Sequence, residues 1–197
     1  MRIITALLVP LFFCSIAKAQ YNVTPGKGID KVQLGMPVKD ILSIIGKPTE
    51  IITYEAEKKA WQGFRYDVTT TLVFTIPFDH VYIFDNAANP YAIWKIYTRN
   101  DSAVIFNQSS YQSGETIAKK ITINNDLRFF DDSLAVKRMF GDNFEKKIDE
   151  MNNTHVIYKD KGIFFIVNEN QVRNVFLFAP KERQQAVRSS CPPEIWL

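Results

Sequence analysis

A repeated segment is the feature of this sequence that most constrains its fold. The stretch from Val32 to Gly46 aligns with the stretch from Leu127 to Gly141 at a constant offset of 95 residues. Apolar side chains lie opposite apolar side chains along the alignment, and the closing glycine recurs. Such internal similarity is typical of two copies of one supersecondary unit. We therefore expect two tandem repeats.

The similarity continues downstream at a shorter offset. Residues 80–86 align with residues 162–168 at an offset of 82, and residues 94–97 align with residues 175–178 at an offset of 81. Both pairs of segments are apolar and aromatic, which favours strands. This alignment predicts that the strand near residue 82 in the first copy is equivalent to the strand near residue 164 in the second.

Further apolar runs of strand length occur in both copies, separated by turn residues. They are Leu72–Phe78, Val81–Phe84, Ile93–Tyr97, Ala103–Phe106, His155–Tyr158, Ile163–Val167 and Val172–Phe178. Short amphipathic helices precede them. Their apolar faces contain Val38, Ile41, Leu42 and Ile45 in copy one and Val136, Met139 and Phe140 in copy two. Because helices come first and strands follow, the sequence predicts an α+β fold, with a short helix or helix pair on an antiparallel sheet in each repeat.

The first nineteen residues have the features of an export signal. An apolar stretch follows Arg2 and ends at Ala17-Lys18-Ala19, which is an A-x-A cleavage motif. Cleavage after Ala19 predicts a periplasmic or secreted protein. The alternative is an outer-membrane lipoprotein anchored through Cys14, which is less favoured because the bulky Phe13 precedes the cysteine. The expected organisation is signal peptide 1–19, repeat 20–110, degenerate repeat 111–180 and C-terminal tail 181–197.

Charge and composition disfavour several functions. Without Arg2 and Lys18, 22 basic side chains face 21 acidic ones, so no nucleic-acid or anionic-membrane partner is expected. No apolar segment of the mature chain is long enough to predict a transmembrane helix. Cys191 alone remains after cleavage and cannot form an internal disulfide.

The sequence contains no recognisable catalytic or metal motif. His80 and His155 are isolated from one another, and neither lies in a metal-binding spacing. Asp131 and Asp132 are neighbours that suit a helix N-cap better than an acid/base pair. We therefore expect a protein that is not an enzyme and binds no cofactor or metal.

The first copy also carries a family motif. Val32-Gln33-Leu34-Gly35-Met36-Pro37, followed by Ile44-Ile45-Gly46-Lys47-Pro48, resembles the L-G-M…L-G-x-P signature of the BamE/SmpA family of small outer-membrane lipoproteins. A similar signature occurs in the β-lactamase inhibitor protein (BLIP) superfamily, in which two copies can be joined in tandem. The resemblance implies helices on one face of an antiparallel sheet and a non-catalytic binding role in the cell envelope.

The other face of the sheet is the expected binding surface. Because side chains alternate along a strand, the downstream alignment places one set of residues away from the helices. These candidate partner-binding residues are Tyr82, Phe84, Lys95, Tyr97, Phe164, Ile166, Phe176 and Phe178. Exposed aromatic side chains of this kind mark protein interfaces. Burial of this face, between sheets or beneath the tail, is the structural alternative. The predicted function is non-catalytic binding of an envelope or secreted protein; the alternatives are an inhibitor or immunity protein and a small hydrolase with an unrecognised site.

Overall fold

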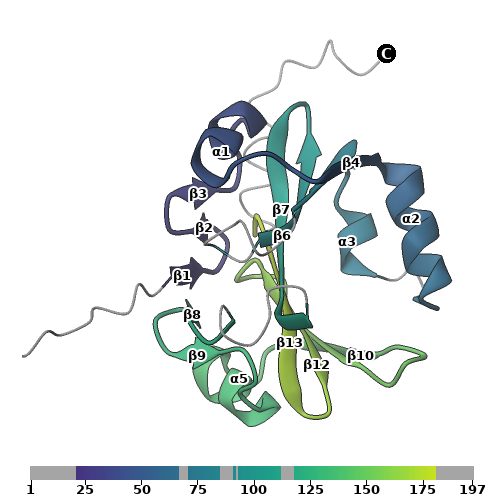
Figure 1. The fold of residues 1–197 in the computed structure, drawn as a ribbon. Coiled ribbons are helices and arrows are strands. Elements are labelled where there is room, and N and C mark those ends of the chain that lie inside the picture. The colour runs from purple at the N-terminus through teal and green to yellow at the C-terminus, as the bar shows by residue number, and fades with distance from the viewer. Residues whose placement is uncertain (1–20, 67–70, 85–90, 92, 112–117, 181–197) are drawn as a thin grey trace, which may run out of the picture.

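The computed structural model describes residues 21–66, 71–84, 91, 93–111 and 118–180 (Figure 1). The predicted signal peptide, Cys191 and the tail from 181 to 197 lie outside these residues. The helices are α1 (Val38–Ile45), α2 (Tyr54–Gly63), α3 (Leu72–Thr75) and α5 (Ser133–Phe140). The strands are β1 (Tyr21–Thr24), β2 (Gly28–Ile29), β3 (Val32–Gln33), β4 (Glu50–Thr53), β5 (His80–Ile83), β6 (Ile93–Arg99), β7 (Ser102–Ser109), β8 (Ile121–Ile123), β9 (Leu127–Arg128), β10 (Glu145–Ile148), β11 (Thr154–Tyr158), β12 (Ile163–Asn168) and β13 (Gln171–Phe178).

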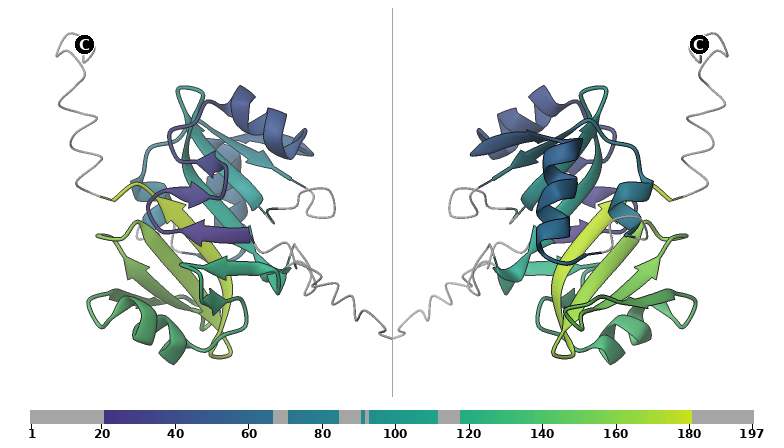
Figure 2. Two further views of the ribbon diagram at one scale, coloured as in Figure 1. Left: turned by 90° about the vertical axis from the view of Figure 1, so that its left-hand side faces the viewer. Right: turned by 90° about the vertical axis from the view of Figure 1, so that its right-hand side faces the viewer.

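The strands form two sheets, and the predicted α+β class is confirmed. An eight-stranded antiparallel sheet has the order β10-β11-β12-β13-β7-β6-β5-β4. A small sheet has the order β3-β2-β1-β8-β9, in which β1 and β8 are parallel. Figure 2 (left) shows α1 and α5 at opposite ends of the small sheet. The two repeats therefore share both sheets.

The repeat predicted from the sequence is visible in the element boundaries. Helix α5 and strand β10 follow α1 and β4 by 95 residues, and β13 follows β7 by 69 residues. Matching left-handed turns precede β7 and β13, at Asn100-Asp101 and at Glu169-Asn170. Isolated bridges also correspond, joining Pro37 to Ser102 and Asp132 to Gln171. The offset falls by 26 residues because copy one is longer between β4 and β7, where it carries α2 and α3.

The strand alignment downstream of residue 80 is wrong by one strand. It matched β5 with β12 and β6 with β13, whereas the sheet order makes β5 equivalent to β11, β6 to β12 and β7 to β13. Similar aromatic strands follow one another in both copies, so the alignment slipped onto the next strand. In β5 the alignment also paired residues of opposite faces, such as Val81 and Ile163, so the predicted face of this strand was inverted, whereas that of β6 was correct.

One face of the large sheet carries the main core, as expected from the helix pattern. Helices α1 and α5 and the small sheet pack on this face, which we call the first face (Figure 1). Ile41 on α1 and Val136 on α5 are equivalent positions, and both have 0% exposure. Gly46 and Gly141 end the two helices as predicted. Asp132 caps α5, since its carboxylate accepts a hydrogen bond from the Ala135 N–H at 2.7 Å.

The opposite face, which we call the second face, is covered by α2 and α3 (Figure 2, right). The run Leu72–Phe78 was predicted as a strand, but its first four residues form α3. A short continuous apolar run does not distinguish a strand from a buried helix, so the pattern was ambiguous here. Helix α2 was not predicted, because Glu57 occupies a buried position on its inner side, beside Trp61.

One backbone position differs in kind between the copies. Gly35 has a φ of 83°, and Phe130, its equivalent 95 residues later, keeps a φ of 72°. A positive φ is strained for a residue with a large side chain. The Phe130 ring lies 5.0 Å from the guanidinium of Arg173, a cation–π contact that glycine could not make. Copy two thus has a strained backbone at Phe130 and gains a contact between this ring and Arg173.

Candidate functional site

The predicted partner-binding residues are mostly buried. Lys95, Tyr97, Phe164, Ile166, Phe176 and Phe178 have exposures of 0–7% and belong to the second face. Phe84 is 2% exposed and half-buried Tyr82 lies nearby, but both pack in the first-face core. In strand β5 the second face is instead formed by Val81 and Ile83. The prediction of an open aromatic face is therefore wrong. Seven of the eight residues are buried, which was the structural alternative.

Helices α2 and α3, with Phe78 in the segment between α3 and β5, bury this face through aromatic contacts. The Trp61 ring lies 6.2 Å from Phe176, and the Phe78 ring lies 5.0 Å from Tyr97 in an edge-to-face arrangement. Val73 on α3 is 1% exposed in the same cluster. Each such side chain contributes about 1.5–3 kcal/mol on burial, so removing both helices from the sheet would cost several kcal/mol.

A buried polar cluster fixes α2 to the sheet. The carboxylate of Glu57 is 0% exposed and accepts hydrogen bonds from Lys95 Nζ at 2.7 and 2.8 Å. It also accepts hydrogen bonds from the Tyr97 hydroxyl and from Trp61 Nε1, both at 2.7 Å. Burial, followed by the neighbouring Glu57 charge, raises the pKa of Tyr97 well above 10. Lys95 and Tyr97 thus have internal partners and serve to dock α2.

A hollow of about 400 Å³ lies where the α2–α3 segment meets the β10–β11 hairpin. We call it the hairpin hollow. Its lining residues include Tyr66, Leu72, Lys147, Ile148, His155 and Ile157. A concave surface with an apolar wall and a few polar groups is the usual form of a binding pocket, and its volume lies at the lower end of the range for ligand sites.

One carboxylate organises the hairpin side of this hollow. Oδ1 of Asp149 accepts hydrogen bonds from the backbone N–H groups of Met151 and Asn153, both at 2.9 Å. Oδ2 of Asp149 lies 2.9 Å from Asn153 Nδ2 and 3.1 Å from His155 Nε2. Asn168 Nδ2 in turn donates to Asn153 Oδ1 at 2.7 Å. The turn that carries the rim of the hollow is therefore fixed by side-chain hydrogen bonds.

Two aromatic rings form the inner wall of the hollow. The His155 ring lies 6.1 Å from Tyr66 and stacks on Phe164 at 6.1 Å, while Tyr66 also contacts Trp61 at 4.8 Å. Burial lowers the pKa of His155, against the opposing effect of Asp149. Burial, with smaller effects of Asp149 and Tyr111, raises the pKa of Tyr66 to about 12. At neutral pH both rings are therefore uncharged.

The hairpin beside the hollow exposes apolar side chains. Ile148 pairs with Thr154, so its side chain points to the opposite face of the sheet from His155 and Ile157, which line the hollow. Ile148 is 60% exposed and Met151 is 52% exposed, and both belong to the β10–β11 hairpin. Single exposed apolar residues are common, but two beside a hollow are more informative. This site could not be predicted from the sequence, because its two walls are about 80 residues apart along the chain and meet only in the fold.

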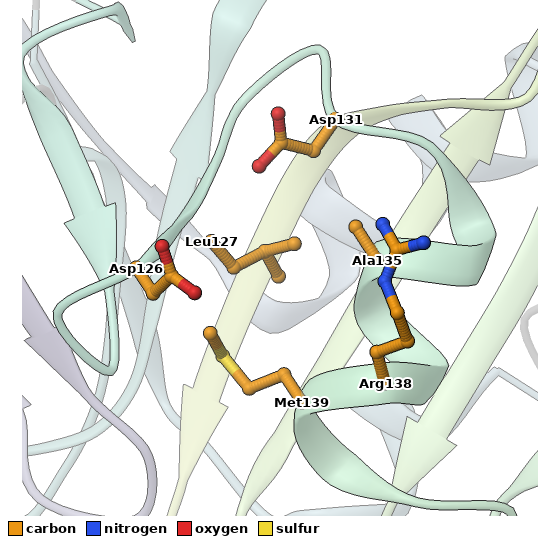
Figure 3. A pocket seen from close by; sticks show the side chains of 6 residues that line it. All are labelled: Asp126, Leu127, Asp131, Ala135, Arg138 and Met139. Carbon is orange, nitrogen blue, oxygen red and sulfur yellow. The ribbon is translucent and has the colours of Figure 1, made fainter.

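A second hollow, of about 380 Å³, lies between α5 and the β8–β9 turn. Figure 3 shows the carboxylates of Asp126 and Asp131 and the guanidinium of Arg138 around Leu127 and Met139. Asp131 already accepts a hydrogen bond from the Arg128 N–H at 2.7 Å, which is a local turn contact. This hollow thus has fewer features of a protein-binding site than the hairpin hollow.

Two further observations concern the described residues only. They contain no group of three or more His, Cys, Asp or Glu side chains placed to hold a metal ion. None of their helices is long and apolar enough to cross a membrane. His80 is exposed at the start of β5, away from His155 on β11.

Comparison with known proteins gives little further information. No family model and no curated protein matches the chain. Among solved structures, a cysteine-rich secretory protein from Staphylococcus aureus is similar at 11% identity and a TM-score of 0.40, over 84% of this chain and 50% of that one. The chain thus spans half the length of that protein, and a likeness at this level carries no functional argument. The BamE/SmpA and BLIP resemblance rests on residues 32–48 alone.

Proposed function

We propose that this chain is an exported, non-catalytic protein of the cell envelope that binds a partner protein at the hairpin hollow. The A-x-A motif after residue 16 supports export. The observation that carries the binding proposal is an apolar hollow, lined by Leu72 and Ile157, beside a hairpin that exposes the side chains of Ile148 and Met151. Interface anchors are typically apolar or aromatic groups that meet a pocket inside a polar border.

The structure of the hairpin favours binding in a further way. Asp149 fixes the turn from 149 to 153, so the exposed residues of the hairpin need little ordering when a partner docks. Preorganisation of this kind lowers the entropic cost of association. Polar side chains, Lys147 and Glu150, border the apolar groups, as they do around protein interfaces. The site therefore replaces the aromatic sheet face as the candidate docking surface.

Site-specific photocrosslinking tests this proposal. A photoreactive phenylalanine analogue is placed at Ile148 or Met151, and at Leu134 as a control, since Leu134 on α5 is apolar and 57% exposed. The proteins are expressed in the native host and irradiated in intact cells. We expect one adduct of the same mass from positions 148 and 151 and none from position 134.

The crosslinked protein is then identified, purified and titrated against the mature chain. We expect Ile148→Asp to weaken binding by about tenfold or more, because an apolar contact is replaced by a charge, and Leu134→Asp to change it by less than about twofold. Equal adducts from all three positions, no adduct at all, or equal effects of the two Asp variants would contradict the assignment of the site.

A further inference from the structure

Buried polar atoms without a hydrogen-bond partner gather at one end of the β7–β13 ladder. In the described part of the chain they are Asn107 Oδ1, Gln108 Oε1, Ser110 Oγ, Arg173 Nε and Asn174 Oδ1. The two stretches are neighbours, because Ser109 at the end of β7 pairs with Asn174 near the start of β13. Buried polar groups are almost always hydrogen-bonded, so a cluster of unpaired ones calls for an explanation, of which a bound ion is one.

The internal repeat shows that this fold does not require polar side chains at these positions. Under the offset of 69 that relates β7 to β13, all five are apolar in the other copy: Phe176 for Asn107, Leu177 for Gln108, Ala179 for Ser110, Val104 for Arg173 and Ile105 for Asn174. Phe176, Leu177 and Ile105 have exposures of 1–2% and belong to the core. An unpaired buried polar group lowers stability, so polar residues here favour a role other than stability.

The unpaired atoms divide between the two faces of the sheet. Asn107 and Asn174 lie on the second face, since their strand partners belong to its core. Gln108 lies on the first face opposite Val175, and the Arg173 guanidinium contacts a ring that packs on the first-face core. Because Arg173 precedes Val175 by two residues in β13, Gln108 and Arg173 are diagonal neighbours on one face.

Arg173 brings a positive charge to this end of the ladder. Its guanidinium lies 5.0 Å from the Phe130 ring and 5.5 Å from the Tyr111 ring, and Nη2 donates to Gln171 Oε1 at 2.7 Å. Gln171 is uncharged, and among the residues that the structure describes no carboxylate forms an ion pair with this guanidinium. A partly buried charge is normally paired, so Arg173 is available to an anion from outside the chain.

The two carboxylates that precede α5 are used elsewhere. The backbone of Asp131 and the backbone of Asp132 both reach the start of β13. However, Oδ2 of Asp131 accepts a hydrogen bond from the Arg128 N–H, and Oδ1 of Asp132 accepts one from the Ala135 N–H, both at 2.7 Å. These carboxylates thus hold a turn and a helix cap, and neither neutralises Arg173.

Ser110 and Gln108 complete the set of polar groups. Ser110 is 5% exposed and directly follows the last pair of the ladder, and its neighbour Tyr111 contacts the guanidinium. Its hydroxyl can rotate to donate to an anionic oxygen. Gln108 is 1% exposed, and its Nε2 donates to the Tyr91 carbonyl at 2.6 Å, which leaves Oε1 as an acceptor. The guanidinium and the hydroxyl together suit a carboxylate or a phosphate.

We propose that Arg173, Ser110 and Gln108 form a binding site for an oxyanion that carries its own hydrogen-bond donor. The guanidinium and the hydroxyl donate to the anionic oxygens, and Gln108 Oε1 accepts from the donor. A phosphoryl group that keeps a proton and a carboxylate beside an amide N–H, as at the C-terminus of a peptide, share this chemistry. None of the three residues lines the hairpin hollow, so the site does not depend on the proposed function.

Small anions test the site in the mature protein. The probes are inorganic phosphate, N-acetylglycine, acetate and chloride, and the readout is the NMR signal of the Arg173 Nε–H group. We expect saturable shifts with phosphate and N-acetylglycine at a Kd on the order of 1–10 mM, and binding of acetate, which lacks the donor, at least about threefold weaker. The tighter of the first two identifies the source as a phosphoryl group or as a carboxylate beside an amide.

Variants connect the shifts to the three residues, with binding followed by calorimetry. Arg173→Gln should weaken binding of the tighter anion by about tenfold or more, and Ser110→Ala by about threefold. Arg128→Gln, an exposed arginine on β9, should leave it unchanged. Ser110→Ala places the alanine of the other copy at this position, so its melting temperature should equal or exceed that of the parent. If Arg173→Gln melts far below the parent, Ser110→Ala decides.

Several results would overturn the proposal. They are the absence of saturable binding by both phosphate and N-acetylglycine, equal shifts with chloride, unchanged binding in Ser110→Ala, and equal weakening by Arg128→Gln. Acetate binding as tightly as phosphate and N-acetylglycine would remove Gln108 from the site.

Discussion

Loss of the Lys95 ammonium should destabilise the protein strongly. In the Lys95→Met variant the aliphatic stem is kept, but Glu57, which is 0% exposed, loses its cationic partner. Two of the four hydrogen bonds to that carboxylate disappear, leaving those from Trp61 and Tyr97. Breaking a buried ion pair in this way typically costs about 3–5 kcal/mol, because an uncompensated charge remains in the core. We expect a loss of that size in the free energy of unfolding.

Urea denaturation followed by tryptophan fluorescence measures this loss, with Lys59→Met as the control on the exposed side of α2. The control should change the unfolding free energy by less than about 0.5 kcal/mol. A double-mutant cycle with Glu57→Gln isolates the pair: the double variant should lose less than the sum of the single variants, by about 1 kcal/mol or more. A loss below about 1 kcal/mol for Lys95→Met, or strict additivity, would refute the view that this pair docks α2.

Three further predictions concern the two repeats and the hairpin. Ile41→Ala and Val136→Ala should each lower the unfolding free energy by about 2–4 kcal/mol in urea titrations, because both side chains are fully buried at equivalent positions; unchanged melting of both variants would contradict this. Gly35→Ala should cost about 1–2 kcal/mol from its φ of 83° alone, since a Cβ there meets no atom within 4 Å; a neutral effect in the same titration would exclude backbone strain. Burial lowers the folded-state pKa of His155 below 6.5, so the unfolded chain takes up its proton first as the pH falls, and stability should decrease from about pH 6.5 down to the lowered value. His155→Gln should reduce the difference in unfolding free energy between pH 7.5 and pH 5, and an unchanged difference would assign it to other groups.

Local patterns predicted part of this fold correctly. The helix faces around Ile41 and Val136, the stops at Gly46 and Gly141 and the cap at Asp132 follow from interactions within a few residues. Periodicity and capping depend only on neighbouring residues, so a single sequence carries them. The repeat itself was also readable from the sequence, because equivalent positions need equivalent side chains.

Features that depend on contacts between residues far apart in the chain could not be predicted from the sequence. Helix α2 carries Glu57 on its buried side, and only the Lys95 ammonium, 38 residues away, makes that position acceptable. The aromatic residues of the second face form a core beneath α2 and α3, although the same pattern predicted an exposed surface. Alternation along a strand identifies the two faces of a sheet, but it does not show what covers them. The hairpin hollow was missed for the same reason.

The pairing of β7 with β13 has a consequence for the origin of the chain. Asn107 lies opposite Phe176, and these two residues are equivalent under the offset of 69. The flanking pairs follow the same rule. Phe106 pairs with Leu177 and Gln108 pairs with Val175, so the offset of 69 exchanges one pair with the other. Strand β7 therefore pairs with its own counterpart, β13, about a local two-fold axis, as identical subunits do in a symmetric dimer. A chain with one copy alone would leave this strand as an unpaired edge, and it could continue its sheet in the same way only by pairing with a second molecule about that axis.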